Sequence, residues 1–118
     1  MISRDLLKEM KAAGCRTIWF GVESGSPRIL SKLNKGVSIE QMVKAFKLGR
    51  AEDIRISFSV MLGILGETVS YIKTTFNFAK KLDPDCIHFN IFVAYPGSGL
   101  YDKVMENGLY DRVEDFVA

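Results

Sequence analysis

The hydrophobic pattern of this chain switches repeatedly between a two-residue period and a period of three to four residues. Bulky apolar residues alternate with small or polar ones at about 16–22, 54–62 and 86–93, and this alternation predicts three strands. Apolar residues three and four positions apart predict helices at 4–13 and 27–35 and a third helix that starts at Ser38. A fourth helix is predicted to end at about Lys81 and a fifth at about Asn107. Every strand is followed by a helix, which predicts a parallel sheet with right-handed crossovers.

Local signals mark the ends of these helices. Ser26 can cap the helix that starts at Pro27, because serine is favoured at the cap and proline at the first helical position. Ser38 and Gln41 have the spacing of a capping box. Glycine stops are expected at Gly14, Gly36 and Gly108. The residues expected to face inward are Leu6, Leu7 and Met10 in the first helix, Ile39, Met42, Val43 and Phe46 in the third, and Ile72, Phe76 and Ala79 in the fourth.

The two faces of the predicted sheet differ in character. One face carries Ile18, Phe20, Val22, Ile56, Phe58, Val60, Leu62, Ile87, Phe89, Ile91 and Val93, whereas the alternating positions are small, polar or mixed. A parallel sheet with helices on both faces should be apolar on both. We therefore interpret the mixed face as the inside of a barrel or half-barrel that holds a ligand. The alternative is an open sheet whose polar face is partly wet.

Four polar residues of the mixed face are expected at a similar height, namely Glu23, Ser59, His88 and Asn90. Glu23 ends the first strand just before a turn and a helix, where α/β proteins place ligand contacts. As an alternative, Glu23 supplies only a charge at the helix N-terminus. His88 is expected to be a satisfied polar core residue, and no catalytic residue is assigned.

Composition limits the function classes. The 118 residues, with a net charge of +2, indicate one domain over 1–118, with no signal for nucleic acid or a membrane surface. No apolar run approaches a membrane span, and the charged amphipathic start is unlike a signal peptide, so a cytoplasmic protein is expected. The two cysteines, Cys15 and Cys86, have no metal-site spacing. A disulfide between them is possible, but two small buried or half-buried residues are expected.

Four motifs, taken together, carry a resemblance to a known family. They are Gly21-Val22-Glu23-Ser24-Gly25-Ser26, Leu33-Asn34-Lys35-Gly36, Met61-Leu62-Gly63-Ile64-Leu65-Gly66-Glu67-Thr68 and Ala94-Tyr95-Pro96-Gly97-Ser98-Gly99-Leu100-Tyr101. In this order and at these intervals they resemble the C-terminal half of a radical S-adenosylmethionine (radical SAM) domain. The branch it resembles contains cobalamin-binding radical SAM enzymes, tRNA methylthiotransferases and elongator-type proteins. The resemblance covers essentially the whole chain and implies strands four to six, half of a (β/α)6 partial TIM-type barrel.

The resemblance also implies roles. Glu23, with Ser24, corresponds to the family's ribose motif, where a carboxylate accepts hydrogen bonds from both vicinal hydroxyls. Leu62 and Gly63 correspond to the segment that packs against adenine, and the end of the third strand offers backbone contacts to the same ring. The alternative is that Gly63, Gly66 and Tyr95-Pro96 only form turns. The predicted cofactor-binding residues are Glu23, Ser24, Ser59, Leu62, Gly63, Asn90, Val93, Ala94 and Tyr95.

Several departures from the family pattern shape the expected function. The Cys-x-x-x-Cys-x-x-Cys loop that holds a [4Fe-4S] cluster is absent from the sequence, as is the glycine-rich motif for the methionine moiety. Leu65 stands where relatives commonly carry proline, and Ala51-Glu52-Asp53 replaces the usual Ala-Gly. The chain therefore resembles a fragment of a radical SAM oxidoreductase or transferase, inactive alone, that supplies ribose and adenine contacts and part of the substrate wall. The cluster would belong to the parent only, and no metal ligand is assigned in this chain.

Expected partners are the remainder of the parent domain and a second copy of the chain, through open sheet edges. A different class of function is a degenerate, non-catalytic half-barrel that acts as an interaction module. A third, a barrel enzyme for another nucleotide or phosphate, is disfavoured because the sequence has no glycine-rich phosphate loop.

Overall fold

The computed structural model describes residues 2–109, which form a three-stranded parallel sheet with helices between the strands. The prediction of one domain over 1–118 extends beyond these residues. In chain order the elements are α1 (Arg4–Ala12), β1 (Thr17–Glu23), α2 (Pro27–Lys32), α3 (Ile39–Ala51), β2 (Arg55–Leu62), α4 (Val69–Leu82), β3 (Cys86–Ile91) and α5 (Tyr101–Glu106). The predicted order of helices and strands is confirmed, and with it the α/β class.

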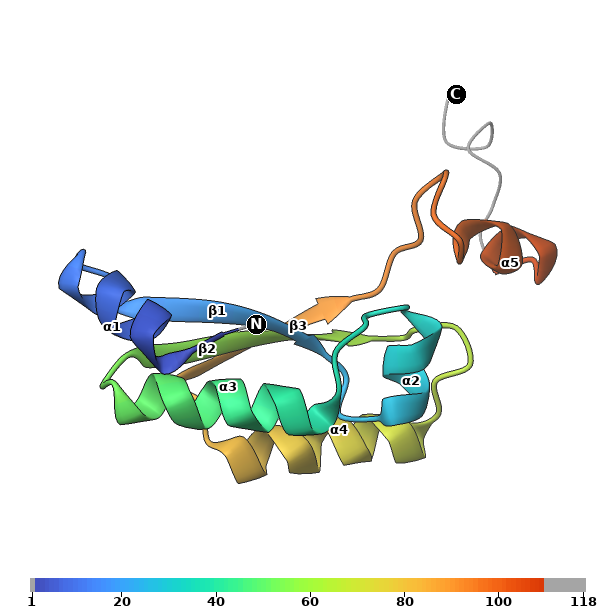
Figure 1. The fold of residues 1–118 in the computed structure, drawn as a ribbon. Coiled ribbons are helices and arrows are strands. Elements are labelled where there is room, and N and C mark those ends of the chain that lie inside the picture. Colours follow the sequence, from blue (N-terminus) through green and yellow to red (C-terminus); the bar gives the residue numbers. More distant parts are fainter. Residues whose placement is uncertain (1, 110–118) are drawn as a thin grey trace.

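The strands lie in the order β1-β2-β3, and both neighbouring pairs are parallel. Helices α3 and α4 cover one face of the sheet, and α5 is set apart beyond the end of β3 (Figure 1). Because all strands run the same way, the ends at Glu23, Leu62 and Ile91 point to the same edge of the sheet. Ligand contacts in such folds gather at this edge.

The core forms between the apolar face of the sheet and the helices. Strand residues Val22, Ile56, Phe58 and Val60 pack with helix residues Leu7, Met42, Phe46 and Ala79. Burying side chains of this size removes about 1.5–3 kcal/mol of unfavourable hydration each, before the entropy cost of ordering them. The alternation predicted for β1 and β2 is therefore confirmed.

Three expectations about inward-facing residues are wrong. Leu6 is exposed, because α1 turns Leu7 alone fully into the core. In α4, Thr75 and Ala79 face the sheet, and Phe76 lies on the flank, where it stacks on Phe89 with ring centroids 5.0 Å apart. On β3 Ile87 packs against the core, whereas Phe89 is half-exposed beside Phe76 of α4, and Ile91 and, after the strand, Val93 are exposed.

The helix ends show which local signals act. The capping box is confirmed: Gln41 N donates to Ser38 Oγ (3.2 Å), and Ser38 N donates to Gln41 Oε1 (2.8 Å). Ser26 occupies the cap of α2, but its side chain makes no capping bond. Helix α2 ends at Lys32, earlier than expected, and the left-handed Asn34 (φ +50°) redirects the chain. Strand β3 ends at Ile91 and the chain then leaves the sheet.

Both outer strands have one unpaired edge within the described part of the chain. The self-association expected through these edges stays a prediction. Among residues 2–109, none of the helices has the length and apolar character that crossing a bilayer requires.

Candidate functional site

The end of β1 is irregular, and the irregularity centres on Glu23. Gly21 pairs with Ser59, but the next pair joins Glu23 to Val60, so β1 carries one extra residue there. Glu23 has a φ of +65°, and Ser24 N donates to Val22 O (2.8 Å), which closes a three-residue turn around it. A left-handed conformation costs a residue with a side chain about 1–3 kcal/mol, and such strain concentrates at functional sites.

The turn places the Glu23 carboxylate above Gly21, beside Lys35. Lys35 Nζ lies 3.1 Å from Glu23 Oε1, and the side chains are 31% and 16% exposed, respectively. A Cβ built on Gly21 would lie 2.6 Å from Glu23 Oε1 and 3.0 Å from Lys35 Nζ. The pair therefore occupies space that any larger residue at position 21 would fill. Lys35 belongs to the motif Leu33-Asn34-Lys35-Gly36, which predicts no role for it. Its place beside Glu23 follows only from the fold.

An aromatic contact crosses the mixed face of the sheet. The rings of Trp19 on β1 and His88 on β3 have centroids 4.1 Å apart. Because β2 lies between these strands, the rings meet above β2, where the register places Ser57 and Ser59. Ser57 is only 4% exposed although no described helix covers this face. Side chains of the sheet itself therefore cover part of this face.

The structure brings some of the predicted polar residues together on this face. Ser59 stands in one row of the sheet with Gly21 and His88, so it lies below the edge that holds the Glu23 carboxylate. Asn90 pairs with Met61, nearer the ends of the strands, and is exposed. By register Glu23 lies one row beyond Ser59 and His88 and one row before Asn90, so the four residues predicted to share a height fall in three successive rows of the sheet.

The segment after β2 is held as a fixed loop. Gly63 (φ +81°) donates its N–H to Glu67 Oε2 (2.7 Å), and Glu67 N donates to Ile64 O (2.7 Å). Lys32 Nζ donates to the carbonyl of Leu65 (3.0 Å), the residue that stands where the family pattern commonly has proline. A Cβ on Gly63 would meet no atom within 4 Å, so this glycine is required by its backbone angle and leaves open space beside it.

The segment after β3 lies beyond the sheet. Val93 and Tyr95 are exposed and Ala94 is buried. Ser98 N donates to Tyr95 O (3.0 Å), so a turn does form around Pro96 and Gly97. The backbone contacts to adenine predicted for Val93, Ala94 and Tyr95 stay predictions.

The side chain of Ser24 faces away from the open face. It is fully buried, its Oγ lies 3.1 Å from Thr75 Oγ1 on α4, and it accepts a bond from Ser26 N (3.1 Å). Thr75 Oγ1 also accepts from Gly25 N (3.0 Å). These bonds fix the β1–α2 turn to α4, and nothing in the sequence motif indicated Thr75. A ligand contact from the Ser24 side chain stays a prediction.

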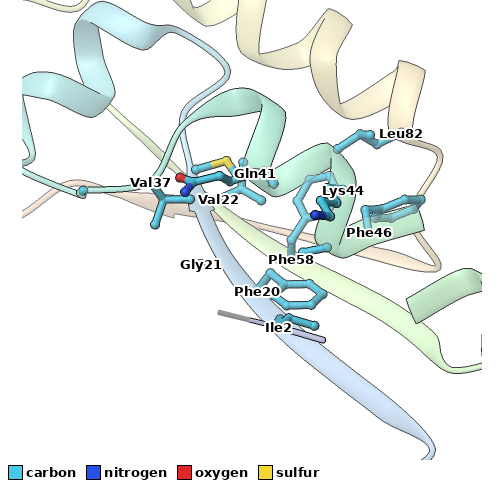
Figure 2. A pocket seen from close by; sticks show the side chains of 13 residues that line it. Ile2, Phe20, Gly21, Val22, Val37, Gln41, Lys44, Phe46, Phe58 and Leu82 are labelled. Atoms are coloured by element: carbon cyan, nitrogen blue, oxygen red, sulfur yellow. The ribbon is translucent and has the colours of Figure 1, made fainter. Parts of the chain in front are cut away.

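A separate apolar cavity of about 430 Å³ lies on the helix side of β1 (Figure 2). Its lining includes Phe20, Val22, Met42, Phe46 and Phe58, with Gln41 and Lys44 as polar members. The side chains of Phe20 and Val22 point to the core side of the sheet, so the cavity lies there, and Gly21, beneath the Glu23 carboxylate, also lines it.

Residues 2–109 do not fit an iron–sulfur cluster. Within them no three His, Cys, Asp or Glu side chains are grouped to hold a metal ion. The two cysteines are free, and their thiols contact different residues. Cys15 Sγ donates to Thr17 O, and Cys86 Sγ contacts His88. We therefore derive no step through a cluster on these residues.

The fold and the residues around Glu23 define an α/β protein with a parallel sheet and a half-buried carboxylate at its C-terminal edge. Comparison with known families gives this class a name: the family model of the Radical SAM superfamily matches residues 1–79. The chain belongs to the radical SAM superfamily.

Two curated relatives illustrate the match. An "Uncharacterized methyltransferase PH0819" of Pyrococcus horikoshii is 39% identical over 107 residues, which are 91% of this chain and 23% of that protein. A tRNA-2-methylthio-N(6)-dimethylallyladenosine synthase of Clostridium botulinum is 29% identical, over 88% of this chain and 24% of that protein. The chain spans about a fifth to a quarter of the length of these curated relatives.

A solved structure confirms the fold. The radical S-adenosylmethionine methyltransferase TsrM of Kitasatospora setae, solved with cobalamin and a [4Fe-4S] cluster bound, matches 91% of this chain and 20% of its own, with a TM-score of 0.81 and 21% identity. The three parallel strands and their helices therefore match part of a radical SAM partial barrel.

Proposed function

We propose that this chain forms the part of a radical SAM domain that binds the nucleoside portion of S-adenosylmethionine. In this proposal β1, β2 and β3 are strands four to six of the barrel. The observation that carries it is the Glu23 carboxylate, held by Lys35 above Gly21 in a strained turn at the C-terminal end of β1. A preformed, half-buried carboxylate at this edge suits two adjacent ribose hydroxyls, which are both hydrogen-bond donors.

The loop after β2 extends the same proposal. Gly63 leaves open space beside its backbone, and the bonds from Glu67 hold that backbone in place. A flat adenine ring needs such a close approach to the main chain, and Leu62 adds an apolar contact. Ser59 and Asn90, on the open face below, would line the same side of the ligand.

The site carries two charges, the positive ammonium of Lys35 and the negative carboxylate of Glu23. Its ion pair uses Glu23 Oε1, so Oε2 is available to a hydroxyl while the ammonium holds the carboxylate in place. We propose that the pair persists when the ligand binds. When bound, the cofactor supplies the radical chemistry, whereas these residues bind and orient its ribose.

The rest of a radical SAM domain would supply the other walls. The described residues lack a cluster-binding group, so we propose that the [4Fe-4S] cluster and the methionine contacts come from that remainder, and that this chain alone is inactive. Because the named relatives include a methyltransferase and a methylthio-group synthase, we propose a transferase or oxidoreductase of the cobalamin and methylthiotransferase branch as the parent.

Calorimetric titration of the chain tests the proposal. S-adenosylmethionine should bind weakly but more tightly than ATP or methionine, and adenosine should compete with it. Losing a charge-assisted bond costs about 1.5–3 kcal/mol, so Glu23→Gln should weaken binding about 10- to 100-fold. Glu9→Gln, an exposed carboxylate of α1, is the matched control and should bind like the unmodified chain. Equal affinity in Glu23→Gln, or no preference over ATP, would overturn the ribose role; binding of none of these ligands would favour the interaction module.

A further inference from the structure

A thiol and an imidazole lie in contact on the open face of the sheet, away from the Glu23 carboxylate. Cys86 Sγ is 3.3 Å from His88 Nε2, and Cys86 is exposed to solvent. The two residues are two positions apart on β3, so both side chains project from the same face. A cysteine within hydrogen-bond reach of a histidine nitrogen is the arrangement that activates a thiol for nucleophilic attack.

A third residue fixes the orientation of the imidazole. Trp19 reaches over β2 from β1, and its ring lies against His88 with an interplanar angle of 37°. The small side chains of Ser57 and Ser59 beneath the rings leave room for this contact. Trp19 thus contacts the imidazole from β1, while Nε2 of the same ring contacts the sulfur of Cys86 on β3. The site is thus built from residues of two strands that are not neighbours in the sheet, β1 and β3.

The other cysteine lies in a different environment and serves as an internal reference. Cys15 is half-buried, and its thiol donates to the carbonyl of Thr17 at 3.5 Å. A carbonyl accepts a hydrogen bond only from the protonated thiol, so this contact favours the unreactive form. The chain therefore holds one thiol beside a base and one beside an acceptor that cannot take its proton.

We infer that Cys86, His88 and Trp19 form a nucleophilic thiol site for soft carbon electrophiles. His88 Nε2 takes the thiol proton, the sulfur lone pair forms a C–S bond, and the bond from that carbon to its leaving group breaks with both electrons going to the leaving group. The site faces the same side of the sheet as Ser59, so an electrophilic ligand held on that face would meet it. The inference rests on the contacts of Cys86 and does not depend on the Glu23 proposal.

Alkylation of the folded chain by iodoacetamide at pH 7, with mass mapping of each cysteine over time, measures this reactivity. Here the C–I bond breaks and iodide leaves. Cys86 should react at least about tenfold faster than Cys15, and also faster than Cys86 of the same chain unfolded in urea, where the thiol is exposed but has no fixed base. His88→Gln should lower the Cys86 rate to the urea value, and Trp19→Ala should lower it in part.

Ile91→Ala is the matched control, because Ile91 is an exposed residue of the same strand and should leave the rate unchanged. Circular dichroism of each variant verifies that the sheet is intact. His88→Asn keeps a neutral polar side chain without a base, so a slow rate in a folded His88→Asn protein separates lost base from lost structure. The inference is overturned when Cys86 reacts no faster folded than in urea, or when both His88 variants retain its rate.

Discussion

The ammonium group of Lys35 lies 3.1 Å from a carboxylate oxygen of Glu23, although the two residues are twelve positions apart. Helix α2 and the left-handed turn at Asn34 bring the lysine back to the strand from which the chain had departed. Gly21 makes the contact possible, since both charged groups occupy the space that a side chain at position 21 would take. The candidate site thus depends on a residue that contributes no functional group.

We predict that Gly21→Ala removes ligand binding without unfolding the protein. The new methyl group would lie 2.6 Å from Glu23 Oε1, which is the end of a flexible side chain and can move away. The carboxylate would then leave its position above β1, so affinity for S-adenosylmethionine should fall about 10- to 100-fold, as in Glu23→Gln. Titration measures the loss, and circular dichroism measures the fold. Gly99→Ala, where a methyl group meets open space, should change neither.

The position of Ser24 leads to a prediction about stability. Thr75 Oγ1 contacts Ser24 Oγ, accepts from Gly25 N and donates to Tyr71 O. Thr75→Val keeps the shape but leaves a buried N–H unpaired, so the free energy of unfolding should fall by about 1–3 kcal/mol. Thr75→Ser keeps the hydroxyl and should cost less.

The control for this substitution is Thr74→Val on the same helix. Thr74 is exposed, and its hydroxyl bonds only Ser70 O of its own helix, so the cost should stay below about 0.5 kcal/mol. Urea unfolding at equilibrium gives all three values. Equal losses for Thr74→Val and Thr75→Val would show that the bonds between Thr75 and the β1–α2 turn contribute nothing to stability.

The fold was predictable because its signals are local. The capping box at Ser38 and Gln41 and the alternation of β1 and β2 each depend on residues within a few positions of one another. The alternation also identified the open face correctly. On β3 the same reasoning failed for Phe89 and Ile91, because whether an apolar residue is covered depends on where a distant helix lies, and α5 is set apart from that edge.

The candidate site was predictable only in part. Glu23 follows from its place at the end of a strand, but its left-handed backbone and its contact with Lys35 depend on the bulge and on the path of α2. The burial of Thr75 instead of Phe76 depends on how α4 is rotated about its axis. The sequence does not determine this rotation, because α4 carries apolar residues on two adjacent faces. The contact between Trp19 and His88 joins non-neighbouring strands, and no periodicity within one strand encodes it.

Two glycines in contact with neighbouring elements should respond differently to the same substitution. A Cβ on Gly25 would lie 2.8 Å from Phe78 Cβ and 2.9 Å from Thr75 Cα, atoms that move only with the backbone of α4. A Cβ on Gly49 would lie 2.5 Å from Ile56 Cδ1, the end of a side chain that can change rotamer. Overpacking costs about 1–3 kcal/mol when it cannot be relieved.

Gly25→Ala should therefore lower the free energy of unfolding by about 2 kcal/mol or more, because α4 must shift. Gly49→Ala should be nearly neutral, because alanine is favoured over glycine inside a helix by about 0.5–1 kcal/mol, which offsets the movement of Ile56. Urea denaturation of both variants measures the difference. A larger loss for Gly49→Ala, where the distance from the added Cβ to its neighbour is the shorter of the two, would show that side-chain flexibility does not decide the cost.

The last prediction concerns the free edges of the sheet. β1 and β3 each present unpaired backbone groups, and the β3 edge adds the exposed side chains of Phe89 and Ile91, the latter 75% accessible. Such edges pair with other chains unless charge or covering segments prevent it. We expect light scattering at high protein concentration to give a mass above that of one chain.

Ile91→Lys should reduce this association, because it places a charge at the β3 edge where a second strand would pair, and the exposed position makes the folding cost small. Leu6→Lys is the matched control, since Leu6 is an exposed apolar residue on α1, away from the sheet edges. Association that weakens equally in both variants would indicate nonspecific hydrophobic contact. A monomeric mass for the unmodified chain at every concentration would refute the prediction and show that these edges are protected by their twist and by the side chains around them.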